Sequence, residues 1–100
     1  MPWTLYAVPT GRRADLDAAL RDDLVSRQSQ KLRDAAALGG PSDRLYVLIE
    51  GTAEGVRRAD DLLREVGEPL SAADRERLFA QFKAEEESAS AGMGLFFTEE

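Results

Sequence analysis

The apolar segment Leu45–Ile49 limits the possible folds of this chain more than any other feature of its sequence. All five of its residues are apolar, so it lacks the alternation of apolar and polar positions that marks a strand with one face in water. A short continuous run of this kind is typical of a central strand that is covered on both faces. We therefore expect a sheet with Leu45–Ile49 in its interior.

Leucines at helical spacing predict a long helix before this strand. They recur every four residues from Leu16 to Leu24, and Leu32 continues the row, which favours one helix over residues 13–38. Such a helix would be roughly 39 Å long, about twice the length of a six-residue strand. The alternative is a break near Ser26–Ser29, but no glycine or proline lies there to cause one.

Further elements are predicted before this helix and after the strand Leu45–Ile49. Trp3–Val8 and Met93–Thr98 are short, apolar and bounded by proline, glycine or acidic residues, so both are expected to be strands. Thr52 is predicted to cap a helix that ends at Gly67, and Ser71 to cap a helix that ends among acidic and small residues. The inner faces expected of these two helices are Val56, Ala59, Leu62 or Leu63, Val66, Leu78, Phe79 and Phe82.

The resulting order of elements is β-α-β-α-α-β, in one domain over residues 1–100. One helix between the first two strands makes them parallel with a right-handed crossover, and two helices make the third strand antiparallel to the second. We therefore expect an α/β fold, a two-layer sandwich with about three helices on one face of a small, three-stranded mixed sheet. This plan is similar to that of a ferredoxin-like domain without its central hairpin.

The chain has no cysteine and no histidine, which removes several classes of function. Disulfides, thiolate metal sites, cysteine nucleophiles, imidazole bases and nearly all zinc sites are excluded. The formal charge of -6 disfavours binding to nucleic acid, whose phosphates repel an acidic protein. No cofactor is indicated, because neither a Walker loop nor a GxGxxG motif is present.

Helices on one face of the sheet would leave the opposite face apolar and bare. A contiguous apolar patch of more than a few hundred Å² is rare on a soluble monomer, so we expect a homodimer formed through the sheet, since two-fold assemblies are the commonest. The alternative is that the first helix wraps around and covers this face. The residues expected in the contact are Tyr46, Leu48, Leu95, Phe96 and Phe97, with Trp3 or Tyr6.

A second hypothesis places a small anionic metabolite at the polar segment that interrupts the leucine row. The candidate ligand-binding residues are Arg27, Gln28, Ser29, Arg33 and Asp34. The guanidinium of Arg27 can clamp a carboxylate or phosphate, and Ser29 can add a hydroxyl group. A solvated helical face with ordinary charge pairs explains the same residues more simply.

The acidic residues indicate no metal site. Asp22-Asp23, Asp60-Asp61 and Glu85-Glu86-Glu87 are adjacent acids that point apart on a helix, and none follows the spacing of a calcium loop. Glu50 stands alone at the end of the buried strand, where open α/β sheets tend to bind ligands. It can equally favour the positive end of the helix that follows.

The sequence also bears on location and partners. The N-terminal segment lacks the basic start and apolar core of a secretory signal, and no apolar run approaches the roughly 20 residues of a spanning helix. We therefore expect a cytoplasmic, non-enzymatic accessory or regulatory module without membrane contact that self-associates. A third possibility is that its acidic surface docks onto a basic protein partner.

Overall fold

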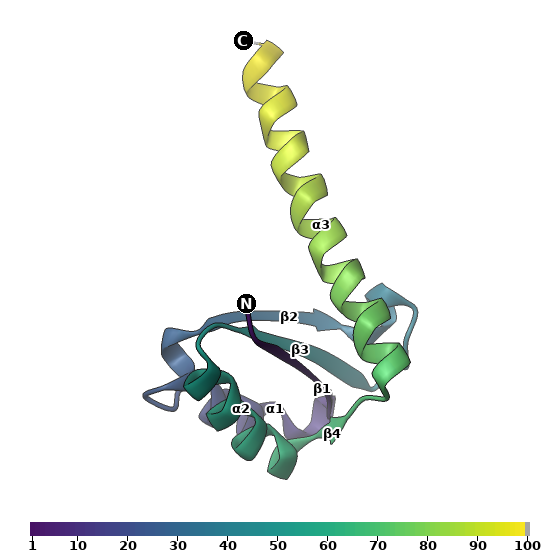
Figure 1. Ribbon diagram of the computed structural model, residues 1–100. Coiled ribbons are helices and arrows are strands. Elements are labelled where there is room, and N and C mark those ends of the chain that lie inside the picture. Colours follow the sequence, from purple (N-terminus) through teal and green to yellow (C-terminus); the bar gives the residue numbers. More distant parts are fainter. Residues whose placement is uncertain (100) are drawn as a thin grey trace.

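A four-stranded antiparallel sheet forms the centre of the computed structural model (Figure 1). The structure describes the backbone of residues 1–99 and the side chains of residues 1–85. The strands are β1 (Trp3–Pro9), β2 (Ser29–Asp34), β3 (Arg44–Glu50) and β4 (Glu68–Pro69). They are ordered β2-β3-β1-β4 across the sheet, and every neighbouring pair is antiparallel.

The prediction of a central strand at Leu45–Ile49 is confirmed. These residues lie within β3, which pairs with β1 on one side and β2 on the other. Every residue from Leu45 to Glu50 is buried, because elements of the chain cover both faces of the strand. The uninterrupted apolar run therefore follows from its place in the middle of the sheet.

The first face of the sheet, here called the α1/α2 face, is covered by α1 (Arg13–Leu20) and α2 (Ala53–Val66). The two helices lie side by side under the strands (Figure 1). Its buried apolar residues are Tyr6, Val8, Leu16, Ala19, Leu20, Val25, Leu45, Val47, Ile49, Ala59, Leu63 and Val66. The largest part of the core lies here.

The opposite face, here called the α3 face, is covered by the start of α3 (Ala72–Glu99) and by the 3-10 helix η3 (Ala35–Leu38). Its buried apolar residues are Leu5, Ala7, Ala35, Leu38, Tyr46, Leu48, Leu78 and Phe82. Both faces of the sheet are thus covered within one chain. The prediction of helices on one face alone, with the other face bare, is wrong.

The single helix predicted over residues 13–38 is also wrong. Helix α1 ends at Leu20, a 3-10 helix follows at Val25–Arg27, and the chain then enters β2. Along β2 the side chains alternate, so that Leu32 packs against the α1/α2 core while Lys31 lies on the α3 face beside Leu48. Pairing with β3 makes successive side chains of β2 point to opposite faces of the sheet. The four-residue spacing of the leucines fits both a helix and this alternation, so it did not reveal the strand.

This additional strand reverses the predicted strand direction. The chain crosses the sheet once more, as β2, between β1 and β3 in the sequence. Strands β1 and β3 are therefore antiparallel rather than parallel, and the sheet is not mixed. The order is β-α-β-β-α-β followed by the terminal helix α3, and β3 lies between β1 and β2 and splits the β-α-β unit. The central hairpin, absent from the prediction, is present as β2 and β3.

The predicted strand at Met93–Thr98 is wrong as well. Its backbone belongs to α3, which continues to Glu99 instead of ending among the acidic residues. The fourth strand is instead the two-residue β4, which pairs with β1 at the edge of the sheet. Leu95, Phe96 and Phe97 belong to the part of the chain whose side chains the structure does not describe.

The predicted starts of the two later helices are confirmed. The hydroxyl of Thr52 accepts a hydrogen bond from the backbone N–H of Gly55 at 3.0 Å, and the hydroxyl of Ser71 accepts one from Asp74 at 3.2 Å. Each side chain satisfies a backbone donor that the first turn of a helix leaves unpaired. The sequence thus located both helix starts to the residue.

Candidate functional site

The predicted ligand-binding residues do not converge. Arg27, Gln28 and Ser29 lie at the beginning of β2, and Arg33 and Asp34 at its end, roughly 15 Å away along the strand. The first three line one shallow hollow of about 370 Å³, whereas the last two line another. The structure therefore brings together only part of the predicted set.

Gln28 supports the beginning of α2. Its amide oxygen accepts a hydrogen bond from the backbone N–H of Thr52 at 2.9 Å, and its amide nitrogen donates to the carbonyl of Leu24 at 2.9 Å. A Cβ atom at Gly51 or Gly55 would lie 1.9 or 2.1 Å from this amide group. The two glycines leave room for Gln28, which occupies the helix N-terminus where an anion would otherwise bind.

Both arginines of the predicted set have acidic partners. Arg27 lies 3.4 Å from the carboxylate of Asp23, and its side chain is 71% exposed. Arg33 donates a hydrogen bond from Nε to Glu85 at 2.7 Å and so ties β2 to α3. These contacts are ordinary surface charge pairs, as the simpler explanation has it, but the segment that carries them is a 3-10 turn and a strand and not the helical face expected.

Glu50 is the most buried charged group near these residues. Its side chain is 8% exposed, its Oε1 accepts a hydrogen bond from Lys83 of α3 at 2.8 Å, and the ammonium of Lys31 on β2 lies 4.0 Å away. The carboxylate thereby links three elements on the α3 face. Glu50 also lines the hollow that contains Arg27, Gln28 and Ser29.

An aromatic and cationic cluster lies at the other side of α3. The rings of Trp3 and Phe79 stack with their centroids 4.2 Å apart at an interplanar angle of 16°. The guanidinium carbon of Arg75 lies 5.0 Å from the centroid of the Trp3 ring. A hollow of about 470 Å³ lies against this cluster, between the start of β1 and the first turns of α3.

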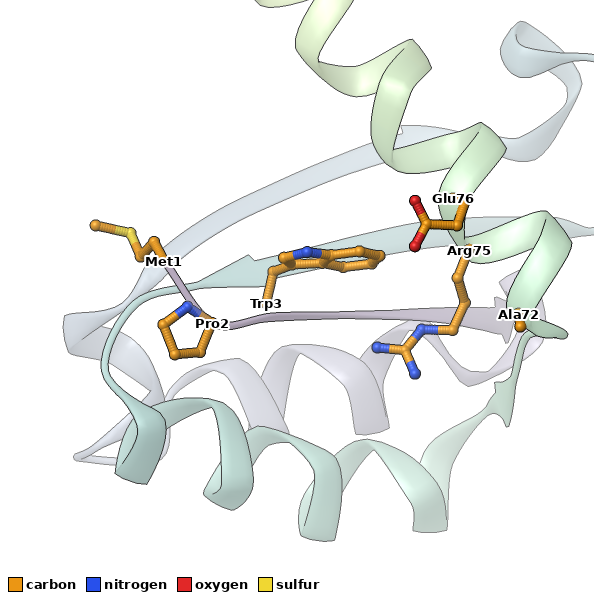
Figure 2. Close-up of a pocket in the computed structure, with 6 residues that line it drawn as sticks. All are labelled: Met1, Pro2, Trp3, Ala72, Arg75 and Glu76. Atoms are coloured by element: carbon orange, nitrogen blue, oxygen red, sulfur yellow. The ribbon is translucent and has the colours of Figure 1, made fainter.

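Figure 2 shows the side chains that line this hollow. They are Met1, Pro2, Trp3, Ala72, Arg75 and Glu76. The guanidinium of Arg75 and the carboxylate of Glu76 point in different directions, with the indole between them. The sequence carried no signal for this arrangement, because Trp3 and Arg75 are far apart along the chain and meet only when α3 packs on the sheet.

Two carboxylates interact with polar groups on the α1/α2 side of the molecule. Burial, followed by the charge of Asp60, raises the pKa of Tyr6 above its ordinary value of 10.0. The hydrogen bond from Arg58 lowers the pKa of Asp22 below its ordinary value of 3.8. Asp60 also accepts a hydrogen bond from the hydroxyl of buried Thr4. These groups join α2 to β1 and to the segment after α1.

The predicted self-association residues have different surroundings. Tyr46 is 5% exposed and Leu48 is fully buried, because η3 and α3 cover them within the same chain. Tyr6 is buried on the α1/α2 face, and Trp3 packs partly buried against Phe79. The bare sheet face that suggested a contact through these side chains does not exist.

Within residues 1–85, no group of three or more acidic side chains is placed to hold a metal ion. Within the described part of the chain, no helix has both the length and the apolar character to cross a membrane. Comparison with family models, with curated proteins and with solved structures finds no match for this chain. The candidate function therefore rests on the residues and geometry described above.

Proposed function

We propose that this chain is a non-enzymatic accessory or regulatory module, ferredoxin-like in plan, that self-associates through the last part of α3. The observation that carries the proposal is the course of this helix. Its first turns pack on the sheet through Leu78 and Phe82, and Glu85 pairs with Arg33 on the edge strand β2. Beyond that point the helix projects away from the rest of the chain (Figure 1).

A projecting single helix needs a partner to be stable. The projecting part of α3, residues 86–99, is 14 residues long. Isolated helices of up to about 12–15 residues are only marginally stable in water. Gly92 and Gly94 weaken this segment further, each by about 1 kcal/mol relative to alanine. Packing against another helix would supply the missing stability.

The sequence of this segment supports a second copy as that partner. Positions 89, 93 and 96 continue, at the spacing of a helix, the row of positions 78, 82 and 85, and they are occupied by Ala89, Met93 and Phe96. Two copies related by a two-fold axis would each offer the same row to the other. The proposal therefore keeps Phe96 in the row, with Leu95 and Phe97 flanking it about 100° to either side, and moves the contact away from Tyr46 and Leu48.

Light scattering coupled to size exclusion at low micromolar concentration tests the proposal. We expect the chain to elute as a dimer of about 22 kDa, twice its mass of 11.0 kDa, and the double variant Phe96→Asp, Phe97→Asp to elute as a monomer. Ala84→Asp, on an exposed position of α3, is the matched control and should remain a dimer. A monomeric parent chain overturns the proposal.

The alternative function is a site for a small anionic metabolite at the start of β2. The observation in its favour is that Arg27 and Ser29 line one hollow. A thermal-shift screen of phosphorylated and carboxylated metabolites tests it, with Arg27→Ala as the variant and the exposed Arg57→Ala as its control. A shift that persists in Arg27→Ala argues against this site. The cytoplasmic location expected from the sequence stays a prediction.

A further inference from the structure

Arg75 differs from its neighbouring arginine on α3. Arg77 pairs with Asp74 at 3.3 Å, whereas Arg75 has no ion pair with any of residues 1–85 and lies instead over the ring of Trp3. Its Nε atom is buried and has no hydrogen-bond acceptor. Because solvent does not reach Nε, a ligand oxygen would bind to the terminal NH₂ groups of the guanidinium, and Arg75 lines a hollow.

The aromatic cluster holds this guanidinium in place. Trp3 is itself stacked on Phe79, so the surface on which Arg75 rests is fixed by β1 and α3 together. A planar guanidinium on an indole face keeps its hydrogen-bonding edge free for a carboxylate or phosphate. Because the side chain is already ordered, binding an anion would cost little further conformational entropy.

We propose that the hollow beside Trp3 and Arg75 binds a small monocarboxylate with an apolar body. The guanidinium of Arg75 takes the carboxylate by charge-assisted hydrogen bonds. The apolar body lies against Met1 and Pro2, which line the same hollow (Figure 2). The volume of about 470 Å³ lies within the range of small-molecule sites, which is roughly 300–1,000 Å³.

Two features select a single negative charge over a phosphate. Glu76 also lines the hollow, and its carboxylate would repel a dianion more strongly than a monoanion. The chain as a whole carries a formal charge of -6, which adds to that repulsion. The site does not depend on self-association, because all of its residues come from the start of β1 and the first turns of α3.

Trp3 is the only tryptophan of the chain, so its fluorescence reports directly on this hollow. We expect phenylacetate to change the Trp3 emission saturably, with a dissociation constant of roughly 1 mM, as befits so small a ligand. Phenylacetamide, which has the same shape without the charge, and inorganic phosphate should each bind at least about tenfold more weakly. Equal binding of phenylacetamide or tighter binding of phosphate overturns the assignment.

Substitutions on α3 locate the site. Arg75→Gln should weaken phenylacetate binding about tenfold or more, whereas Arg75→Lys, which keeps the charge without the planar fork, should have an intermediate effect. Arg77→Gln is the matched control and should bind as the parent chain does. Circular dichroism verifies that each variant is folded. The absence of any saturable change in the parent chain, or unchanged binding by folded Arg75→Gln, overturns the proposal.

Discussion

The two faces of the sheet are covered in different ways. The α1/α2 face is closed by helices that connect the strands, and its buried apolar cluster is joined to α2 by the hydrogen bond of Thr4 with Asp60. The α3 face is closed by a short 3-10 helix and by the start of a terminal helix, and ion pairs of Glu50 and Arg33 border its apolar centre. The connectivity of the strands therefore depends on α1 and α2 but not on α3. We infer that the α1/α2 face determines the fold, whereas α3 is an added cover.

The largest expected effect compares the centres of the two faces. Phe82→Ala on the α3 face should destabilise the protein by about 3–5 kcal/mol, and Leu63→Ala on the α1/α2 face by about 2–5 kcal/mol. Both side chains are almost fully buried, so both faces should behave as core. Urea unfolding followed by circular dichroism measures the two values. A loss below about 1 kcal/mol for Phe82→Ala would mean that α3 does not cover the sheet.

The ion pairs at the border of the α3 face should contribute less. Glu50→Gln is expected to destabilise by about 1–2 kcal/mol, because the carboxylate is buried while the side chain of Lys83 is 38% exposed. The control is Asp15→Asn, whose partner Arg12 and own side chain are both about half exposed, and it should change stability by less than about 0.5 kcal/mol. Equal effects of the two variants would contradict a special role for Glu50.

The smallest effect concerns a charge on the α1/α2 side. The pKa of Asp22 is lowered from 3.8 by its hydrogen bond from Arg58. The pKa of Asp22 is lower in the folded protein than in the unfolded chain. Its ionised carboxylate therefore stabilises the folded state fully above about pH 3.8, and this contribution is lost as the pH falls through the pKa of the folded protein. In Arg58→Gln the pKa should return towards 3.8. Titration of the carboxyl group by NMR measures this, and an unchanged pKa would contradict the assignment.

Local sequence was sufficient where the determinants of structure are local. The run Leu45–Ile49 predicted a central strand, and the caps Thr52 and Ser71 located two helix starts, because each signal lies within a few residues. By contrast, Ser29–Asp34 is polar and contains one leucine. Its strand conformation depends on pairing with β3, which lies elsewhere in the chain.

The candidate sites show the same division. Arg27, Gln28 and Ser29 are adjacent in the chain and share one hollow, as their sequence position suggests. The partner of Gln28 is the start of α2, and Arg75 meets Trp3 across about seventy residues. No local pattern encodes such contacts, so the sequence could indicate residue types but not the cluster on α3.

The central claim is that one chain covers both faces of its own sheet. Isotope-filtered NOE measurements on a mixture of labelled and unlabelled protein test it directly. The signals to follow are those between the methyl groups of Leu48 and the ring of Phe82, which belong to one core cluster. We expect this NOE within a copy and not between copies, even in the dimer. An NOE between copies, or none at all, would show that a partner covers the α3 face or that the face is bare.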